Sequence, residues 1–358
     1  MMADTKSRVN WVDYAKGICI VLVVMMHTTL GVEKAAGALS WLHGFITWAK
    51  PFRMPDFFLI SGLFLAARVH KPWREYLDSK VLHFAYFYVL WMSLQSLFKA
   101  WPLYQAGGFD SVIQDYAHAF VEPYGTLWFI YMLAIFFVVV KLTVNVPPVL
   151  MFVGGAALEM APIETGNLIM DEFAARFVYF YAGFWLARHV FAFAEGVGRM
   201  NVAAIVSGLL IWGYANTIMV ANGYAGLAGY SLALGFVGAL AVVSTGVLLS
   251  KFDWAKPLRY AGENSIVIYL AFFLFMAVTR TVLLRLNLIP DLGMVALVTT
   301  VAGVLGPVFL FWAVNNTRLA FLFHRPSWAR LASRPPQWHT APYVRLKSPK
   351  ARRPSLSR

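Results

Sequence analysis

The strongest constraint on the fold is a series of apolar runs, each about as long as a membrane-crossing helix. A helix needs about 20 apolar residues to cross the hydrocarbon core of a bilayer. The chain has 358 residues, of which 60% are hydrophobic and 13% are charged, whereas soluble domains carry about 25% charged residues. The sequence therefore predicts an all-α, polytopic membrane helix bundle.

Ten segments have this character, so we expect about ten transmembrane helices. The segments in second and fifth place are the shortest. The first follows two basic residues, as a signal peptide would, but it extends to Leu30 without a small-residue cleavage site, so we expect it to be retained. The ten ranges are 14–31, 54–68, 81–98, 125–141, 146–160, 173–189, 201–220, 228–249, 263–284 and 292–314.

The basic residues predict which loops face the cytoplasm, because cytoplasmic loops carry an excess of Lys and Arg. With the N-terminus inside, 23 of the 30 Lys and Arg lie on the cytoplasmic side. The net charge of +13 therefore follows the loops and does not indicate a nucleic-acid partner. We expect a multi-pass protein of the cell inner membrane, with the lipid bilayer as its environment and both the N- and C-termini cytoplasmic.

The chain divides into one membrane domain, 1–323, and a basic, Pro-rich tail, 324–358, which contains no acidic residue. We expect the tail to be disordered and attracted to anionic lipid, although it could equally be a topology signal alone. A single cysteine, Cys19, excludes a disulfide framework and a Cys-based metal site. No Walker loop, nucleophile elbow or metal-spaced His pair is present, so we expect no metal and no tightly bound cofactor.

Three ionisable residues share one face of the first apolar segment. Lys16 and His27 are eleven residues apart, which is about three helical turns and roughly 16 Å along the axis. Asp13 precedes Lys16 by about one turn. Ionisable groups inside a membrane are costly and usually mark functional sites, so we expect this stripe to carry the chemistry.

Arg53, Pro55 and Asp56 stand at the expected start of the second helix. Proline suits the first helical turn, and a carboxylate suits its positive end. Arg53 and the free N–H groups there could hold an anion; alternatively, Asp56 is only a cap and Arg53 an interfacial side chain. His27 lies at a similar depth, where it could act as a general base or be a structural histidine.

Two further positions could bind substrate. Arg74 and Lys80 belong to the basic loop 68–80, which either binds the phosphates of a coenzyme or serves only as a topology signal. Trp128, near the start of the fourth helix, either lines an internal cavity or belongs to an interfacial aromatic belt.

Four segments in this order resemble the membrane acyltransferase-3 family over about residues 13–314. They are Asp13-Tyr14-Ala15-Lys16-Gly17 followed by His27; Arg53-Met54-Pro55-Asp56-Phe57-Phe58-Leu59-Ile60-Ser61-Gly62; Leu127-Trp128-Phe129-Ile130; and Gly262-Glu263-Asn264-Ser265-Ile266-Val267-Ile268-Tyr269-Leu270. The resemblance implies O-acylation of a carbohydrate or another cell-envelope hydroxyl, with acyl-coenzyme A as donor. It implies that His27 is the catalytic base and Lys16 its basic partner, and it makes Ser61, Asn264 and Tyr269 candidate substrate-binding residues.

The chain departs from the family pattern at three positions. Lys16 stands where arginine is usual, which keeps the charge but loses the bidentate fork. Asp56 stands at a position where the family commonly has an apolar residue. Phe272 occupies a position where many members have a second histidine, so a mechanism that needs two histidines is in doubt.

Three functions remain open at this level. The first is an inner-membrane O-acyltransferase that moves an acetyl or succinyl group to a cell-envelope carbohydrate, with Arg53 stabilising the oxyanion. The second is a transporter or flippase for an anionic or acylated envelope molecule. The third is a non-catalytic membrane subunit, which Phe272 would favour. The sequence identifies neither the acyl group, the acceptor nor the oligomeric state.

Overall fold

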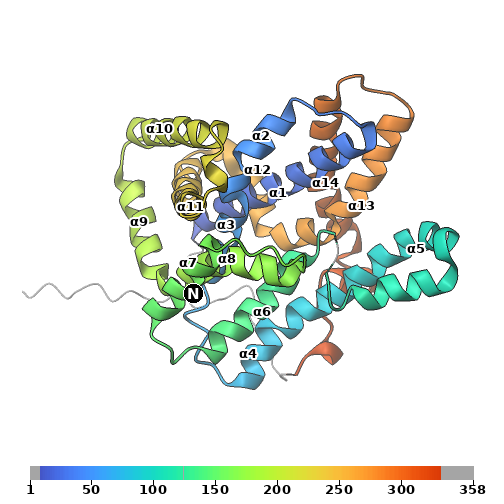
Figure 1. The fold of residues 1–358 in the computed structure, drawn as a ribbon, viewed down its shortest axis with the longest axis horizontal. Coiled ribbons are helices and arrows are strands. Elements are labelled where there is room, and N and C mark those ends of the chain that lie inside the picture. Colours follow the sequence, from blue (N-terminus) through green and yellow to red (C-terminus); the bar gives the residue numbers. More distant parts are fainter. Residues whose placement is uncertain (1–8, 124, 332–358) are drawn as a thin grey trace, which may run out of the picture.

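The computed structural model describes residues 9–123 and 125–331, and in these residues all regular structure is helical (Figure 1). The α-helices are α1 Asn10–Ala36, α2 Leu42–Trp48, α3 Lys50–Gly62, α4 Trp73–Lys80, α5 Leu82–His118, α6 Trp128–Leu142, α7 Pro148–Met160, α8 Leu168–Trp185, α9 Ala187–Arg199, α10 Val202–Ala221, α11 Tyr230–Leu249, α12 Lys256–Glu263, α13 Ser265–Arg285 and α14 Leu292–Val314. Short 3₁₀ helices are η1 Tyr224–Gly226, η2 Asp253–Ala255, η3 Arg318–Leu322 and η4 Ser327–Ala329.

In the described part of the chain, six helical stretches are long and apolar enough to cross a membrane. A seventh span results if α8 and α9, bent by 74° at their junction, count as one. The expected ten spans are not confirmed, although a helix lies in each of the ten ranges. The physical reason is length: α3 and α7 have 13 residues each and α6 has 15, which is about 20–23 Å of helix against a hydrocarbon core of about 30 Å.

Two helix boundaries differ from the sequence expectation. The helix expected to open around Pro55 begins at Lys50, with Pro51 in its first turn and Pro55 in its interior. Asp56 is therefore not a capping residue. The stretch 99–124, which lies between two of the expected helices, is helical as far as His118, because α5 continues through a break at Gly107 and Gly108, and α5 extends away from the bundle (Figure 1).

Helix α1 is central and packs against α3, α11, α12, α13 and α14. Glycines permit the closest of these approaches. A Cβ atom on Gly17 would collide with the carbonyl of Leu258 on α12, and one on Gly262 would collide with the carbonyl of Asp13. Small residues bring membrane helices together in this way, and here they fix the N-terminal half of α1.

Helices α3 and α8 cross through a second pair of glycines. A Cβ atom on Gly62 would meet the carbonyl of Phe180, and one on Gly183 would meet the carbonyl of Leu59. The two backbones are therefore in contact. Side chains that are N-terminal to the crossing on each helix line one cavity.

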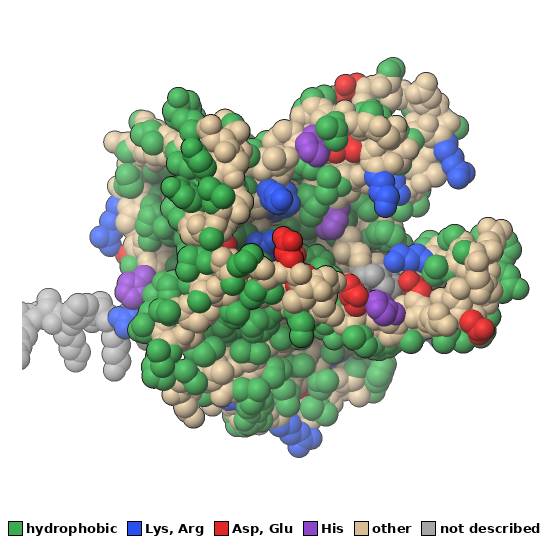
Figure 2. All heavy atoms as spheres, viewed as in Figure 1, with side chains coloured by type: hydrophobic (Ala, Val, Ile, Leu, Met, Phe, Trp, Pro, Cys, Tyr) green, Lys and Arg blue, Asp and Glu red, His purple; other side chains and the backbone are tan. Residues whose placement is uncertain are grey.

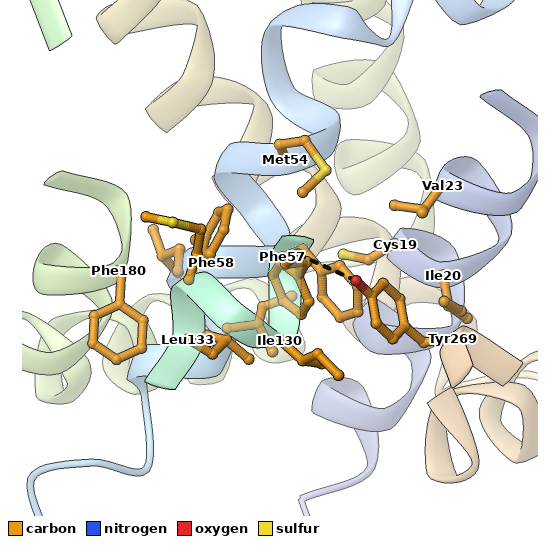
Figure 3. Close-up of a cluster of buried hydrophobic side chains, with 14 of the residues drawn as sticks. Cys19, Ile20, Val23, Met54, Phe57, Phe58, Ile130, Leu133, Phe180 and Tyr269 are labelled. Atoms are coloured by element: carbon orange, nitrogen blue, oxygen red, sulfur yellow. Dashed lines mark hydrogen bonds between the residues drawn. The ribbon is translucent and has the colours of Figure 1, made fainter. Parts of the chain in front are cut away.

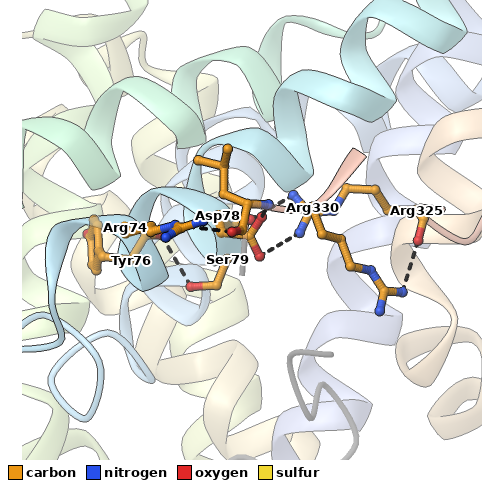
Figure 4. A network of polar contacts seen from close by, with 7 residues as sticks. Arg74, Tyr76, Asp78, Ser79, Arg325 and Arg330 are labelled. Carbon is orange, nitrogen blue, oxygen red and sulfur yellow. Dashed lines mark hydrogen bonds and ion pairs between the residues drawn. The ribbon is translucent and has the colours of Figure 1, made fainter. Parts of the chain in front are cut away.

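The chain returns to α4 near the end of the described residues (Figure 4). Arg325 donates to the Asp78 carboxylate at 2.8 Å, and both side chains are buried. The backbone N–H of Leu331 donates to the second Asp78 oxygen at 2.7 Å. The contact thus extends beyond the domain boundary expected after 323; residues 332–358 of the expected tail lie outside the described residues.

Candidate active-site cavity

A cavity of about 210 Å³ lies between α1, α3, α6, α8 and α13. Figure 2 shows basic, acidic and histidine side chains gathered around a hollow in the middle of one face. The residues that line the cavity are Val23, Met26, His27, Lys50, Arg53, Met54, Phe57, Thr126, Trp128, Phe129, Glu172, Arg176 and Tyr269.

Helix α1 contributes His27, whose half-buried ring packs against Phe272 of α13 with 5.4 Å between ring centroids. Phe272 is fully buried, so it fixes one face of the imidazole while the cavity remains at another. The position that often carries a second histidine in the resembled family therefore supplies an apolar support for His27.

Helix α3 contributes Arg53, which is only 8% exposed. One terminal nitrogen donates to the Ile46 carbonyl of α2 at 3.1 Å, and the buried Nε has no hydrogen-bond partner among the described residues. Lys50 lies one turn before Arg53 and also lines the cavity. Two cationic side chains of the same helix thus face the space next to His27.

Helix α8 contributes an ion pair that the sequence interpretation missed. Nε of Arg176 donates to Glu172 at 3.0 Å, and both side chains are about one-quarter exposed. An available signal was the position of Arg176 inside the expected span 173–189, because an ionisable residue within a span marks a functional site by default.

Helix α13 and the beginning of α6 form another wall of the cavity. Figure 3 shows Tyr269 of α13 among buried side chains of α1, α3 and α6. The Tyr269 hydroxyl donates to the Thr126 carbonyl and accepts from the Phe129 N–H, the latter at 3.2 Å. Phe129 in turn stacks on Phe57 with 4.4 Å between centroids. Tyr269 therefore ties α13 to α6, and Trp128, next to Phe129, is held in the cavity wall.

Asp56 and Asp13 do not line this cavity. The fully buried Asp56 carboxylate accepts a long contact, 3.8 Å, from the thiol of Cys19, which is about 12 Å along α1 from His27. Asp13 is buried where α1 crosses α12. The structure thus brings Arg53 to the cavity beside His27, and it turns Asp56 toward α1.

The remaining candidate residues also lie away from the cavity. Nζ of Lys16 lies 5.7 Å from the Phe64 ring centroid, and Nζ of Lys80 lies 4.5 Å from that of Phe137. Lys16 and Arg68 are close enough to Lys80 to act on it electrostatically, so these three form a separate basic cluster.

Three candidates donate hydrogen bonds to backbone carbonyls. Arg74 donates to the Leu331 carbonyl at 3.1 Å, Ser61 to the Phe57 carbonyl at 2.7 Å, and Asn264 to the Tyr260 carbonyl at 2.9 Å. Over residues 9–123 and 125–331, no group of three His, Cys, Asp or Glu residues is placed to hold a metal ion.

Comparison with known proteins identifies the family of the chain. The Escherichia coli (strain K12) inner membrane protein YcfT is 26% identical over 162 residues, which cover 38% of this chain and 44% of the relative. The match thus spans less than half of the length of that protein. No solved structure matches the chain. The family model described as an acyltransferase domain matches residues 9–314, which include every residue around the cavity, and this multi-pass membrane protein therefore belongs to the acyltransferase-3 family.

Proposed function

We propose that this protein is an integral-membrane O-acyltransferase that moves an acetyl or succinyl group from acyl-coenzyme A to a hydroxyl of a cell-envelope carbohydrate. The observation that carries the proposal is the position of His27 in a cavity that also contains Arg53 and Trp128. Family membership supports the reaction class.

The proposed step requires one base and one oxyanion donor. His27 takes the proton of the acceptor hydroxyl, and the hydroxyl oxygen forms a bond to the thioester carbonyl carbon. The Arg53 guanidinium stabilises the negative carbonyl oxygen of the tetrahedral intermediate. The carbon–sulfur bond then breaks, and the leaving thiolate takes the proton from the His27 imidazolium, which releases coenzyme A and regenerates the base.

Other candidate residues have supporting roles in this scheme. The hydroxyl of Tyr269 is bonded on two sides to the start of α6, so it holds the wall and moves no proton. Asp13 and Asp56 take no part in the step because neither lines the cavity.

The donor would bind at the basic cluster and reach the cavity along α1. Lys16, Arg68 and Lys80 would bind its phosphates, because several cations in one place suit a polyphosphate. Lys16 and His27 are separated by roughly 16 Å along the helix axis, which the extended acyl-bearing arm of the coenzyme would cover. Arg74 is a poorer phosphate ligand because it already contacts Leu331.

The test is transfer of labelled acetyl and succinyl groups from coenzyme A to envelope carbohydrate by the protein in lipid nanodiscs. His27→Ala should lower the rate by about 10²–10⁴-fold with unchanged folded yield and melting temperature. His189→Ala is the matched control, because His189 is exposed on α9 and should leave the rate unchanged.

Mass spectrometry of envelope glycans from a deletion strain and its parent would identify the acyl group and acceptor. Normal transfer by His27→Ala would contradict the assignment of the base. Movement of an envelope molecule across vesicles without covalent label would instead support a transporter.

A further inference from the structure

The cavity lining has an excess of positive charge. Among the described residues that line it, Lys50, Arg53 and Arg176 are cationic, and the only carboxylate is that of Glu172. Glu172 is engaged in its ion pair with Arg176. Asp56, behind the lining, is near enough to attract Arg53, but no carboxylate among the described lining residues pairs with Lys50 or Arg53.

Arg53 is the most informative of these cations. Its side chain is more than nine-tenths buried, and its Nε–H is buried without an acceptor in the described residues. A buried donor that is left without an acceptor is destabilising. The guanidinium also offers donors in a planar fork that fits a carboxylate or a phosphate. The unsatisfied donor next to the cavity is therefore suited to an anionic ligand.

Electrostatics between the helices leads to the same conclusion. Arg53 of α3 and Arg176 of α8 are near enough to repel each other, and the glycine crossing of α3 and α8 holds them at that separation. A neutral sugar would leave the repulsion unchanged. An anion between the two guanidinium groups replaces the repulsion with attraction to both.

We propose that this cavity binds a carboxylate or phosphate group of a substrate between Lys50, Arg53 and Arg176. The inference rests on the proposed transferase function only where it treats that group as part of a substrate. Two sources share this chemistry. The group is either the free carboxylate of a dicarboxylic acyl group such as succinyl, or a carboxylate or phosphate on the acceptor.

The first experiment measures anion binding without any reaction. The purified protein in neutral-lipid nanodiscs is titrated with sodium succinate, inorganic phosphate or sodium chloride at equal ionic strength, and its melting temperature and binding heat are followed. Succinate or phosphate should bind and stabilise the protein more than chloride. Equal effects of all three salts would overturn the inference.

Two variants and a control locate the binding. Arg176→Gln should weaken succinate or phosphate binding by about tenfold or more, because a charge-assisted hydrogen bond is lost. Glu172→Gln should tighten it, since a competing carboxylate is removed. Arg199→Gln is the matched control: Arg199 forms the same kind of pair with Glu195, but in the exposed part of α9, and binding should be unchanged.

A second experiment identifies the source of the anion and separates the two proposals. If Arg176→Gln loses succinyl transfer but keeps acetyl transfer, the anion belongs to the acyl group; equal loss with both donors assigns it to the acceptor, and either outcome supports the inference. Anion binding that depends on Arg176 in a protein without transfer activity would contradict the proposed function alone. Acyl transfer by Arg176→Gln at the wild-type rate, with wild-type anion binding, would contradict this inference alone.

Discussion

At the scale of single residues, helix geometry decides which side chains of α3 meet the cavity. With about 100° between successive residues, Lys50, Arg53 and Phe57 fall within one stripe of the helix, and all three line the cavity. Asp56 lies about 120° from Lys50 around the axis, and its carboxylate meets Cys19 instead. The sequence predicted that His27 lies at a depth similar to that of Arg53 and Asp56, but depth alone does not determine the direction in which a side chain points.

The proposed separation of donor and acceptor ends predicts different kinetics for two residues of α1. Lys16→Ala should raise the apparent requirement for acyl-coenzyme A by about 10–100-fold, which corresponds to the loss of one charged hydrogen bond, and should leave the acceptor preference unchanged. Steady-state kinetics with varied donor measures this. Lys34→Ala, at the exposed opposite end of the same helix, is the control. If Lys16→Ala leaves the dependence of the rate on acyl-coenzyme A unchanged, Lys16 does not bind the donor.

At the scale of helices, the cavity depends on where the elements cross. The α3–α8 crossing through Gly62 and Gly183 sets the distance between the two arginines, and the hydroxyl of Tyr269 sets the position of α6 against α13. The length of the apolar runs predicted a helix in each of the ten ranges, and the second and fifth ranges, which contain α3 and α7, were the shortest. The sequence did not show that α6 has only 15 residues or that α8 and α9 are bent by 74° at their junction, because apolar runs of this length do not differ in composition from longer buried helices.

A methyl group added at the α3–α8 crossing should therefore change the geometry of the cavity, although it does not line the cavity. Gly183→Ala places its Cβ against the Leu59 carbonyl, and overpacking of this kind usually costs about 1–3 kcal/mol. Its melting temperature should fall, together with succinate or phosphate binding. Gly208→Ala is the matched control, because a Cβ there meets nothing within 4 Å and alanine favours the helix. Equal melting temperatures of the two variants would show that α3 and α8 can move apart at the crossing without a loss of stability.

At the scale of the whole molecule, local patterns predicted a membrane bundle and the family, and His27, Arg53, Trp128 and Tyr269 all line the cavity. The contribution of α8 was missed, because the sequence near Arg176 does not indicate that α8 crosses α3. Contacts between segments far apart in the chain are set by packing of the complete bundle. The same reason explains why the contact of Arg74 with the Leu331 carbonyl could not be predicted from the sequence around Arg74.

The number of spans makes a prediction about the termini. Six spans return the C-terminus to the side of the N-terminus, whereas seven place the two ends on opposite sides. From the distribution of Lys and Arg, we expect reporter tags at both termini to indicate the cytoplasm, as the count of six spans requires. A C-terminal tag on the outer side would instead favour the count in which α8 and α9 form one bent span.

The buried pair of Asp78 and Arg325 has a consequence for how the protein is made. These residues are 247 positions apart, so at synthesis rates of about 5–20 residues per second Asp78 emerges roughly 12–50 s before its partner exists. During that interval its carboxylate must stay hydrated, and α4 cannot take its final buried place. The surface formed by α4 and residues 325–331 is therefore completed near the end of translation, after the residues that line the cavity have been made.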